Sequence, residues 1–175
     1  MLNLGAVAFL PDRKEVGSFS INLKPREGAK QKKDTMEWWL TKNKEVYDEI
    51  TKNQQDITLG LTMFKNWLIK MKESNSITGK IIFLCYPTGF DGAFLSAYWM
   101  KAFNGIGLNS VGFAFDFLDI KSYVSGKFNC TYADSGKKAR DFTPDPKLFP
   151  HTHKGEDDAR KLRHFMVNVR DAIIS

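Results

Sequence analysis

A histidine and an aspartate near the end of the sequence could perform chemistry together. His153 lies on a predicted loop, and Asp158 follows in the first turn of a predicted helix. That helix is indicated by apolar residues at helical spacing, which give it one buried face with Asp158 at its N-terminal end. These apolar residues are Leu162, Phe165, Met166, Val169 and Ile173. Both side chains can therefore point into one cleft, and the pair suits a metal-bound water and its general base.

A simpler interpretation of this segment also exists. Glu156, Asp157 and Asp158 are the acids that complement the dipole of a helix in its first turn, and His151 and His153 could be ordinary loop histidines. On this segment alone the simpler interpretation is favoured, and the rest of the chain changes the balance.

A second acid follows a predicted buried strand. The short apolar run from Ile81 to Cys85 is typical of a parallel strand covered on both faces. A turn with proline and glycine comes next, and then a predicted helix with Asp91 at its start. In α/β folds ligands gather at the carboxyl ends of such strands. The alternative is that Asp91 is a helix N-cap.

The remaining elements form the frame for these groups. Two strands, from Leu4 to Leu10 and from Val16 to Leu23, are predicted to form an antiparallel hairpin. Asp34 and Asn43 are predicted to cap two short helices, and Asp56 begins a long amphipathic helix.

Further along, Asp119 is predicted to cap a short helix. Residues 126–150 are predicted to be irregular. Their length hints at a functional loop.

Composition limits the classes of protein. A chain of 175 residues is long enough for one domain with a sizeable core, and the net charge of +6 favours a polyanionic partner. Neither of the two cysteines is part of a C-x-x-C pair, and Cys85 is predicted to be a buried thiol, which indicates a reducing, cytoplasmic setting. No apolar run is long enough for a membrane span.

Aromatic and basic residues offer contacts for a nucleic acid. The basic loop of residues 24–33 is either a solvated connection or a set of phosphate contacts, and both interpretations remain open. Tyr86, Phe90 and Trp38 could stack on terminal bases. For the adjacent Trp38 and Trp39, simple packing against the protein is the favoured alternative.

Three motifs together resemble a known superfamily. They are the run Gly89–Leu95 after the predicted strand, the run Leu118–Lys121, and His153 with Asp158 and Ala159 at the last helix. In order and spacing they resemble the DEDD superfamily of 3′→5′ exonucleases, in its histidine subclass (DEDDh). This subclass includes ribonuclease T and the proofreading subunits of DNA polymerases. The runs 34–39 and 150–153 look like a phage and bacterial 3′→5′ exoribonuclease branch.

The resemblance implies a fold and a reaction. It implies an α/β fold, with a ribonuclease H-like mixed sheet flanked by helices, in a single domain over residues 1–175. It implies two-metal hydrolysis with Mg²⁺ or Mn²⁺, with Asp91 and Asp158 as metal ligands and His153 as general base. The expected partners are the 3′ ends of single-stranded RNA or DNA. A homodimer is one arrangement to test, since several relatives are dimers.

The sequence departs from this family pattern at its start. The family's Asp-x-Glu pair stands on a central strand upstream of a segment like Leu4–Phe9, and no such pair is found here. We therefore expect an N-terminally truncated chain that lacks this first strand, with a form of 175 residues that is inactive or much impaired. The alternatives are a catalytically dead nucleic-acid-binding module on the same fold, and an α/β domain with a structural or interaction role.

Overall fold

The computed structural model describes residues 2–108, 115–149 and 152–172. Strands β1 (Asn3–Phe9) and β2 (Glu15–Asn22) form the predicted antiparallel hairpin, with Asn3 opposite Asn22. Small or polar side chains of this hairpin face the last helix, and apolar ones such as Leu4 and Ile21 face the core. This alternation is the one expected for strands that are covered by different partners on their two faces.

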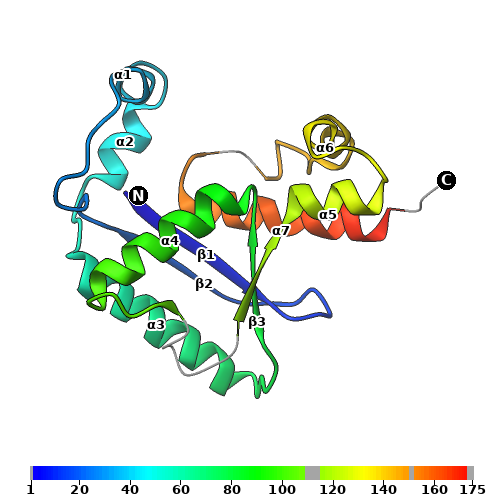
Figure 1. The fold of residues 1–175 in the computed structure, drawn as a ribbon, viewed down its shortest axis with the longest axis horizontal. Coiled ribbons are helices and arrows are strands. Elements are labelled where there is room, and N and C mark those ends of the chain that lie inside the picture. Colours follow the sequence, from blue (N-terminus) through cyan, green and yellow to red (C-terminus); the bar gives the residue numbers. More distant parts are fainter. Residues whose placement is uncertain (1, 109–114, 150–151, 173–175) are drawn as a thin grey trace.

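Two short helices lie together at one corner of the molecule (Figure 1). They are α1 (Lys33–Lys42) and α2 (Lys44–Ile50). The prediction that Asp34 caps the first helix is wrong, because the helix begins one residue earlier and Asp34 lies in its first turn. Asn43 does occupy the N-cap position of α2, although its side chain makes no capping hydrogen bond.

The main core lies between the hairpin and two long helices. Helix α3 (Ile57–Ser74) begins as predicted at Asp56, whose carboxylate accepts the N–H groups of Thr58 at 2.8 Å and Leu59 at 3.2 Å. It packs against α4 (Thr88–Ala102). Fully buried side chains from both helices fill the space against the hairpin, among them Leu61, Phe64 and Trp99.

A second pair of strands carries the acids that the sequence singles out. Strands β3 (Ile81–Cys85) and β4 (Phe115–Asp119) are parallel, with Cys85 opposite Asp119. The prediction that β3 is covered on both faces is wrong at its N-terminal end. There Ile82 and its partner Asp116 are exposed, and Lys80 pairs with Asp116 at the surface.

The C-terminal part of the chain forms a second core. It consists of α5 (Ile120–Lys127), α6 (Tyr132–Ala139), a 3₁₀ turn (Arg140–Phe142) and α7 (Gly155–Asp171). The prediction of an irregular segment over 126–150 is wrong for α6 and the 3₁₀ turn. Helix α6 is short and polar, so its periodicity is weak. It is stabilised by the N-cap Thr131 and by the burial of Ser135 and Ala139.

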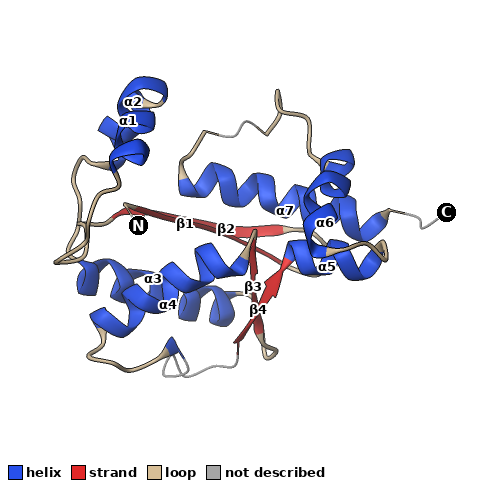
Figure 2. Ribbon diagram, turned by 45° about the horizontal axis from the view of Figure 1, so that its top comes forward, coloured by secondary structure: helices blue, strands red, loops and turns tan. Residues whose placement is uncertain are grey.

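The two strand pairs cross at a steep angle, as both views show (Figures 1 and 2). Helix α7 covers one face of the hairpin, and α3 and α4 cover the other (Figure 2). The α/β class is therefore confirmed. The described strands form two separate two-stranded sheets, where the sequence predicts one mixed sheet. None of the described helices is long and apolar enough to span a membrane.

Candidate active site

Asp91 stands in the first turn of α4, directly after strand β3. The N-cap position is occupied by Pro87, so Asp91 is not the cap that the alternative interpretation requires. The backbone N–H of Tyr86 donates to Asp91 Oδ2 at 3.4 Å, across the turn between strand and helix. The sequence strand, turn and helix thus places this carboxylate at the C-terminal end of β3.

The three consecutive acids at the start of α7 have different surroundings. Glu156 accepts a hydrogen bond from Arg160 at 2.9 Å, and Asp157 accepts one from the hydroxyl of Thr152 at 2.8 Å. These two acids therefore serve the local structure. Asp158 lies on the inner side of the helix, and its Oδ1 atom is buried.

Asp91 and Asp158 are close enough to influence one another. Burial of the Asp91 carboxylate raises its pKa, the N–H of Tyr86 opposes this effect, and the negative charge of Asp158 raises the pKa further. The structure therefore brings together two carboxylates from helices 67 residues apart in sequence.

Asp119 is the third acid at the same sheet edge, and it has a structural role. As predicted it is the N-cap of α5, where it accepts the N–H of Ser122 at 2.7 Å. It also accepts the N–H of Thr88 at 2.6 Å, which ties the start of α4 to β4. Burial raises the pKa of Asp119, but the hydrogen bonds from Thr88 and Ser122 outweigh this effect and lower the pKa overall.

The thiol beneath this edge is inert. Cys85 is buried, as predicted. Burial raises its pKa to about 11, with further contributions from the charges of Asp91 and Asp119. A thiol with so high a pKa is protonated at neutral pH and is a poor nucleophile and metal ligand.

His153 lies on the loop before α7, in a left-handed backbone conformation with φ of 63°. Its ring meets Trp38 edge-on, with ring centroids 4.9 Å apart, and Trp39 with centroids 6.0 Å apart. The next residue, Lys154, forms an ion pair of 2.6 Å with Glu49 of α2. The α1–α2 corner therefore holds the loop that carries the histidine.

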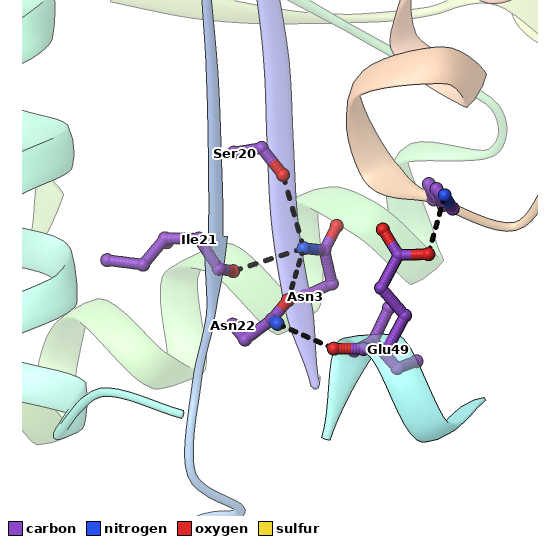
Figure 3. Close-up of a pocket in the computed structure, with 7 residues that line it drawn as sticks. Asn3, Ser20, Ile21, Asn22 and Glu49 are labelled. Carbon is purple, nitrogen blue, oxygen red and sulfur yellow. Dashed lines mark hydrogen bonds and ion pairs between the residues drawn. The ribbon is translucent and has the colours of Figure 1, made fainter. Parts of the chain in front are cut away.

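A small open pocket of about 180 Å³ lies beside this loop (Figure 3). Asn3 is its central residue: its amide nitrogen donates to Asn22 at 2.8 Å, and its amide oxygen accepts the N–H of Gly155 at 2.8 Å. Figure 3 shows Asn3 pointing toward Ser20 and Asn22, with Glu49 opposite. The polar groups of this pocket are directed at one another, so its main effect is to fix the start of α7 on the hairpin.

The predicted stacking residues lie in three different places. Tyr86 follows β3, beside Asp91, and its ring packs edge-on against Phe165 of α7 at 5.7 Å. Phe90 is 60% exposed and touches only Phe94 among the described rings. Trp38 is 39% exposed and lies at His153. Neither Trp38 nor Trp39 is buried in the core. Their rings lie 4.9 Å apart and both pack against His153, which agrees with the favoured interpretation of packing against the protein.

Sequence reasoning missed Glu49 as a partner of the histidine loop. It is one of many acids on short polar helices, and no local signal distinguishes it. The sequence distinguishes Trp39 only as the neighbour of Trp38. The adjacent pair of tryptophans on a helix without buried residues was the available signal for a contact outside the core.

The donor set can be compared with the needs of a divalent ion. The described residues contain no group of three or more His, Cys, Asp or Glu side chains that could hold a metal. Asp91 and Asp158 supply hard oxygen ligands, and Mg²⁺ is commonly held by one or two carboxylates together with waters and substrate phosphates. Burial, and after it the charge of Asp158, raise the pKa of Asp91 by disfavouring its ionised form, and a nearby cation would favour that form. The two acids therefore fit such an ion.

Comparison with known families now places the chain. The family model of the 3′-5′ exoribonuclease Rv2179c-like domain matches residues 1–166. The chain belongs to this family. It is thus a member of an enzyme family, and the matched region contains Asp91, His153 and Asp158. No curated protein matches the chain.

Proposed function

We propose that this Rv2179c-like domain is a metal-dependent 3′→5′ exonuclease of the DEDDh type that acts on the 3′ ends of single-stranded RNA. The observation that carries the proposal is the convergence of Asp91 and Asp158 from the first turns of two helices. The family supports the direction of attack and the choice of RNA, because its members are described as 3′-5′ exoribonucleases.

Asp91 and Asp158 are the proposed metal ligands. When bound, Mg²⁺ or Mn²⁺ would supply an activated water and would neutralise charge on the phosphate. The protein's own contribution is to hold both carboxylates in place. The helices that carry them are fixed by Asp119 at α4 and by Asn3 at α7.

His153 is the proposed general base, which takes a proton from the attacking water at a ring nitrogen. A base must lie within hydrogen-bond reach of that proton, and this needs a fixed ring. The edges of Trp38 and Trp39 restrict the ring, and the strained backbone at φ of 63° is of the kind found at functional sites.

The proposal extends to fold and setting. We propose that residues 1–175 form one exonuclease-like domain of the ribonuclease H-like kind, since the family implies that arrangement. Tyr86, Phe90 and Trp38 are proposed to contact the terminal bases. A cytoplasmic location is proposed because both cysteines are free thiols. A homodimer is an arrangement for solution measurements to test.

Metal binding and hydrolysis should be measured on the same variants. Mn²⁺ binding is followed by electron paramagnetic resonance, and release of mononucleotides from a 3′-labelled oligoribonucleotide is followed in parallel. Asp91→Asn and Asp158→Asn should each weaken Mn²⁺ binding, and His153→Ala should leave it unchanged but slow hydrolysis. Asp116→Asn is the matched control, because Asp116 pairs with Lys80 at the surface. Mn²⁺ binding that is unchanged in both aspartate variants would contradict the proposal.

One observation favours a second candidate function. Among the described residues no group of three or more His, Cys, Asp or Glu side chains could hold a metal, and the Asp91–Asp158 pair alone offers fewer ligands than two metal ions need. A catalytically dead module on this fold would bind single-stranded RNA without Mn²⁺ and would not shorten it.

A 3′-labelled oligodeoxyribonucleotide in the same assay separates RNA from DNA as the substrate.

A further inference from the structure

A cluster of cations and tyrosines comes from the residue after β3, from α5 and α6, and from the 3₁₀ turn that follows α6. We call it the α5–α6 patch and define it by Tyr86, Lys121, Tyr132 and Arg140. The ammonium group of Lys121 lies over the ring of Tyr132, 4.4 Å from its centroid. Helix α6 lies above α5 in Figure 1, and the two helices pack against one another.

Two members of the patch, Tyr86 and Lys121, meet at a common point on α6. A β-carbon at Gly136 would lie 4.0 Å from both the Tyr86 hydroxyl and the Lys121 ammonium. A hydroxyl, an ammonium and the Tyr132 ring are thus gathered near a residue that has no side chain of its own. The sequence analysis did not find this arrangement, because it predicts no helix in this segment.

The patch is joined directly to the candidate active site. The backbone N–H of Tyr86 donates to Asp91, while its ring rests on Phe165 of α7, the helix that carries Asp158. Tyr86 is 37% exposed and Tyr132 is 47% exposed, so both rings are accessible. A strand of nucleic acid whose end lies at the two acids can therefore reach the patch with its neighbouring nucleotides.

The charges of the patch complement a phosphate backbone. Arg140 is the C-cap residue of α6, the helix that begins at Tyr132. Burial and the neighbouring Tyr132 raise the pKa of the Tyr86 hydroxyl, and the positive charge of Arg140 opposes them. The nearby acid Asp119 is already occupied by two backbone N–H groups. Aromatic rings interleaved with cations are the general means by which proteins hold single strands without sequence preference.

We propose that the α5–α6 patch is a subsite for single-stranded RNA upstream of the terminal nucleotide. Lys121 and Arg140 contact backbone phosphates, and the ring of Tyr132 stacks on a base. The inference rests on the proposed function, since the acid pair defines where the 3′ end lies. The proposed function requires such a subsite, because the two carboxylates repel the phosphates of the RNA and nearby cations must offset this repulsion.

Binding without metal tests the patch independently of catalysis. The probe is a fluorescein-labelled oligouridylate of eight nucleotides, and its anisotropy is titrated with the full chain in EDTA. Lys121→Ala and Arg140→Ala should each weaken binding several-fold and should lower the salt dependence by about one phosphate contact, a slope change of roughly 0.7. Tyr132→Ala should weaken binding roughly ten-fold.

Two further variants serve as controls. Lys70→Ala removes the same charge from an exposed position on α3, away from α6, and should bind like the wild type. Lys121→Arg should retain binding, which would separate lost charge from lost packing against Tyr132.

The outcomes separate the two proposals. Equal weakening in Lys121→Ala and Lys70→Ala would overturn the patch, as would a wild-type chain that does not bind the eight-nucleotide probe. Loss of Mn²⁺ binding in Asp91→Asn bears on the proposed function alone. Specific weakening in the Lys121, Tyr132 and Arg140 variants supports the patch even where no hydrolysis is measured.

Discussion

Two aspartates at the same sheet edge, Asp91 and Asp119, have different surroundings and opposite pKa shifts. Both lie where a parallel strand gives way to a helix. Asp119 accepts the N–H groups of Thr88 and Ser122, and its pKa is lowered. Asp91 is partly buried near the charge of Asp158, and its pKa is raised.

The difference shows what separates a structural acid from a functional candidate. A carboxylate surrounded by backbone donors has its charge stabilised by the fold itself. A carboxylate that lies near a second negative charge has its ionised form disfavoured. Its charge becomes favourable only when a cation binds beside it. The two residues occupy the same kind of position in the fold. Their roles are therefore distinguished by the groups that surround them.

The largest expected effect is on hydrolysis. Asp91→Ala should lower the Mn²⁺-dependent release of mononucleotides roughly 10²- to 10³-fold, because it removes a proposed ligand of the metal that would neutralise charge on the phosphate. Asp119→Ala should keep most of the activity per folded molecule, because its carboxylate is engaged by the backbone. Rates are compared after correction for the folded fraction from circular dichroism. Similar losses in both variants would remove the distinction.

His153 differs from both aspartates because its ring is held by other side chains and not by backbone N–H groups. Trp38→Ala should lower kcat roughly ten-fold, because a ring that is no longer restricted is less often in position. Trp38→Phe should recover most of the activity, and Mn²⁺ binding should be unchanged in both variants. A loss of Mn²⁺ binding in Trp38→Ala would show that α1 supports the acids and not the histidine.

The free energy of unfolding should respond differently in the two alanine variants. Asp119→Ala should lower the free energy of unfolding by about 1 kcal/mol, which is typical of a lost N-cap. Asp91→Ala should not lower it, since the ionised carboxylate is disfavoured in the folded protein. Urea unfolding at neutral pH measures both. A fold that is weakened more by Asp91→Ala than by Asp119→Ala would reverse the assignment.

The stabilisation of the folded protein by Asp119 should decrease at acidic pH. The pKa of Asp119 in the folded protein lies below its ordinary value of 3.8, so the stabilisation is present above that value. It is lost as the pH falls through the lower, folded-state pKa. The difference in unfolding free energy between wild type and Asp119→Ala should therefore shrink between pH 5 and strongly acidic pH.

The smallest effect is expected at the ion pair that holds the histidine loop. Both side chains of the Glu49–Lys154 pair are substantially exposed, at 57% and 38%. Glu49→Gln should therefore change the unfolding free energy by at most about 0.5 kcal/mol. Thermal unfolding in low and high salt measures this, and the small difference should vanish in high salt.

The sequence was informative where periodicity and capping chemistry are strong. The hairpin, the caps at Asp56 and Asp119 and the last helix follow from alternation, side-chain oxygens and an apolar stripe. It failed at α6, where a polar helix is stabilised by tertiary burial of Ser135 and Ala139. It also failed at Asp34, because the helix begins without a side-chain cap.

Parts of the site could not be read from the chain. Spacing can place Asp91 and Asp158 at the starts of helices, but only the packing of α7 brings their charges together. The partners of His153 come from α1, more than a hundred residues earlier, and nothing local to the histidine indicates them. The predicted residue His151 lies outside the described residues, as does Ile173.

The contact between Gly5 and Gly155 limits how this protein can vary. A β-carbon at Gly5 would lie 1.9 Å from the backbone carbon of Gly155, so no larger residue fits without moving the helix. Asp158 lies less than one turn further along that rigid rod. The close approach of strand and helix therefore sets the position of Asp158, and a single methyl group added at Gly5 would shift the Asp158 carboxylate relative to that of Asp91.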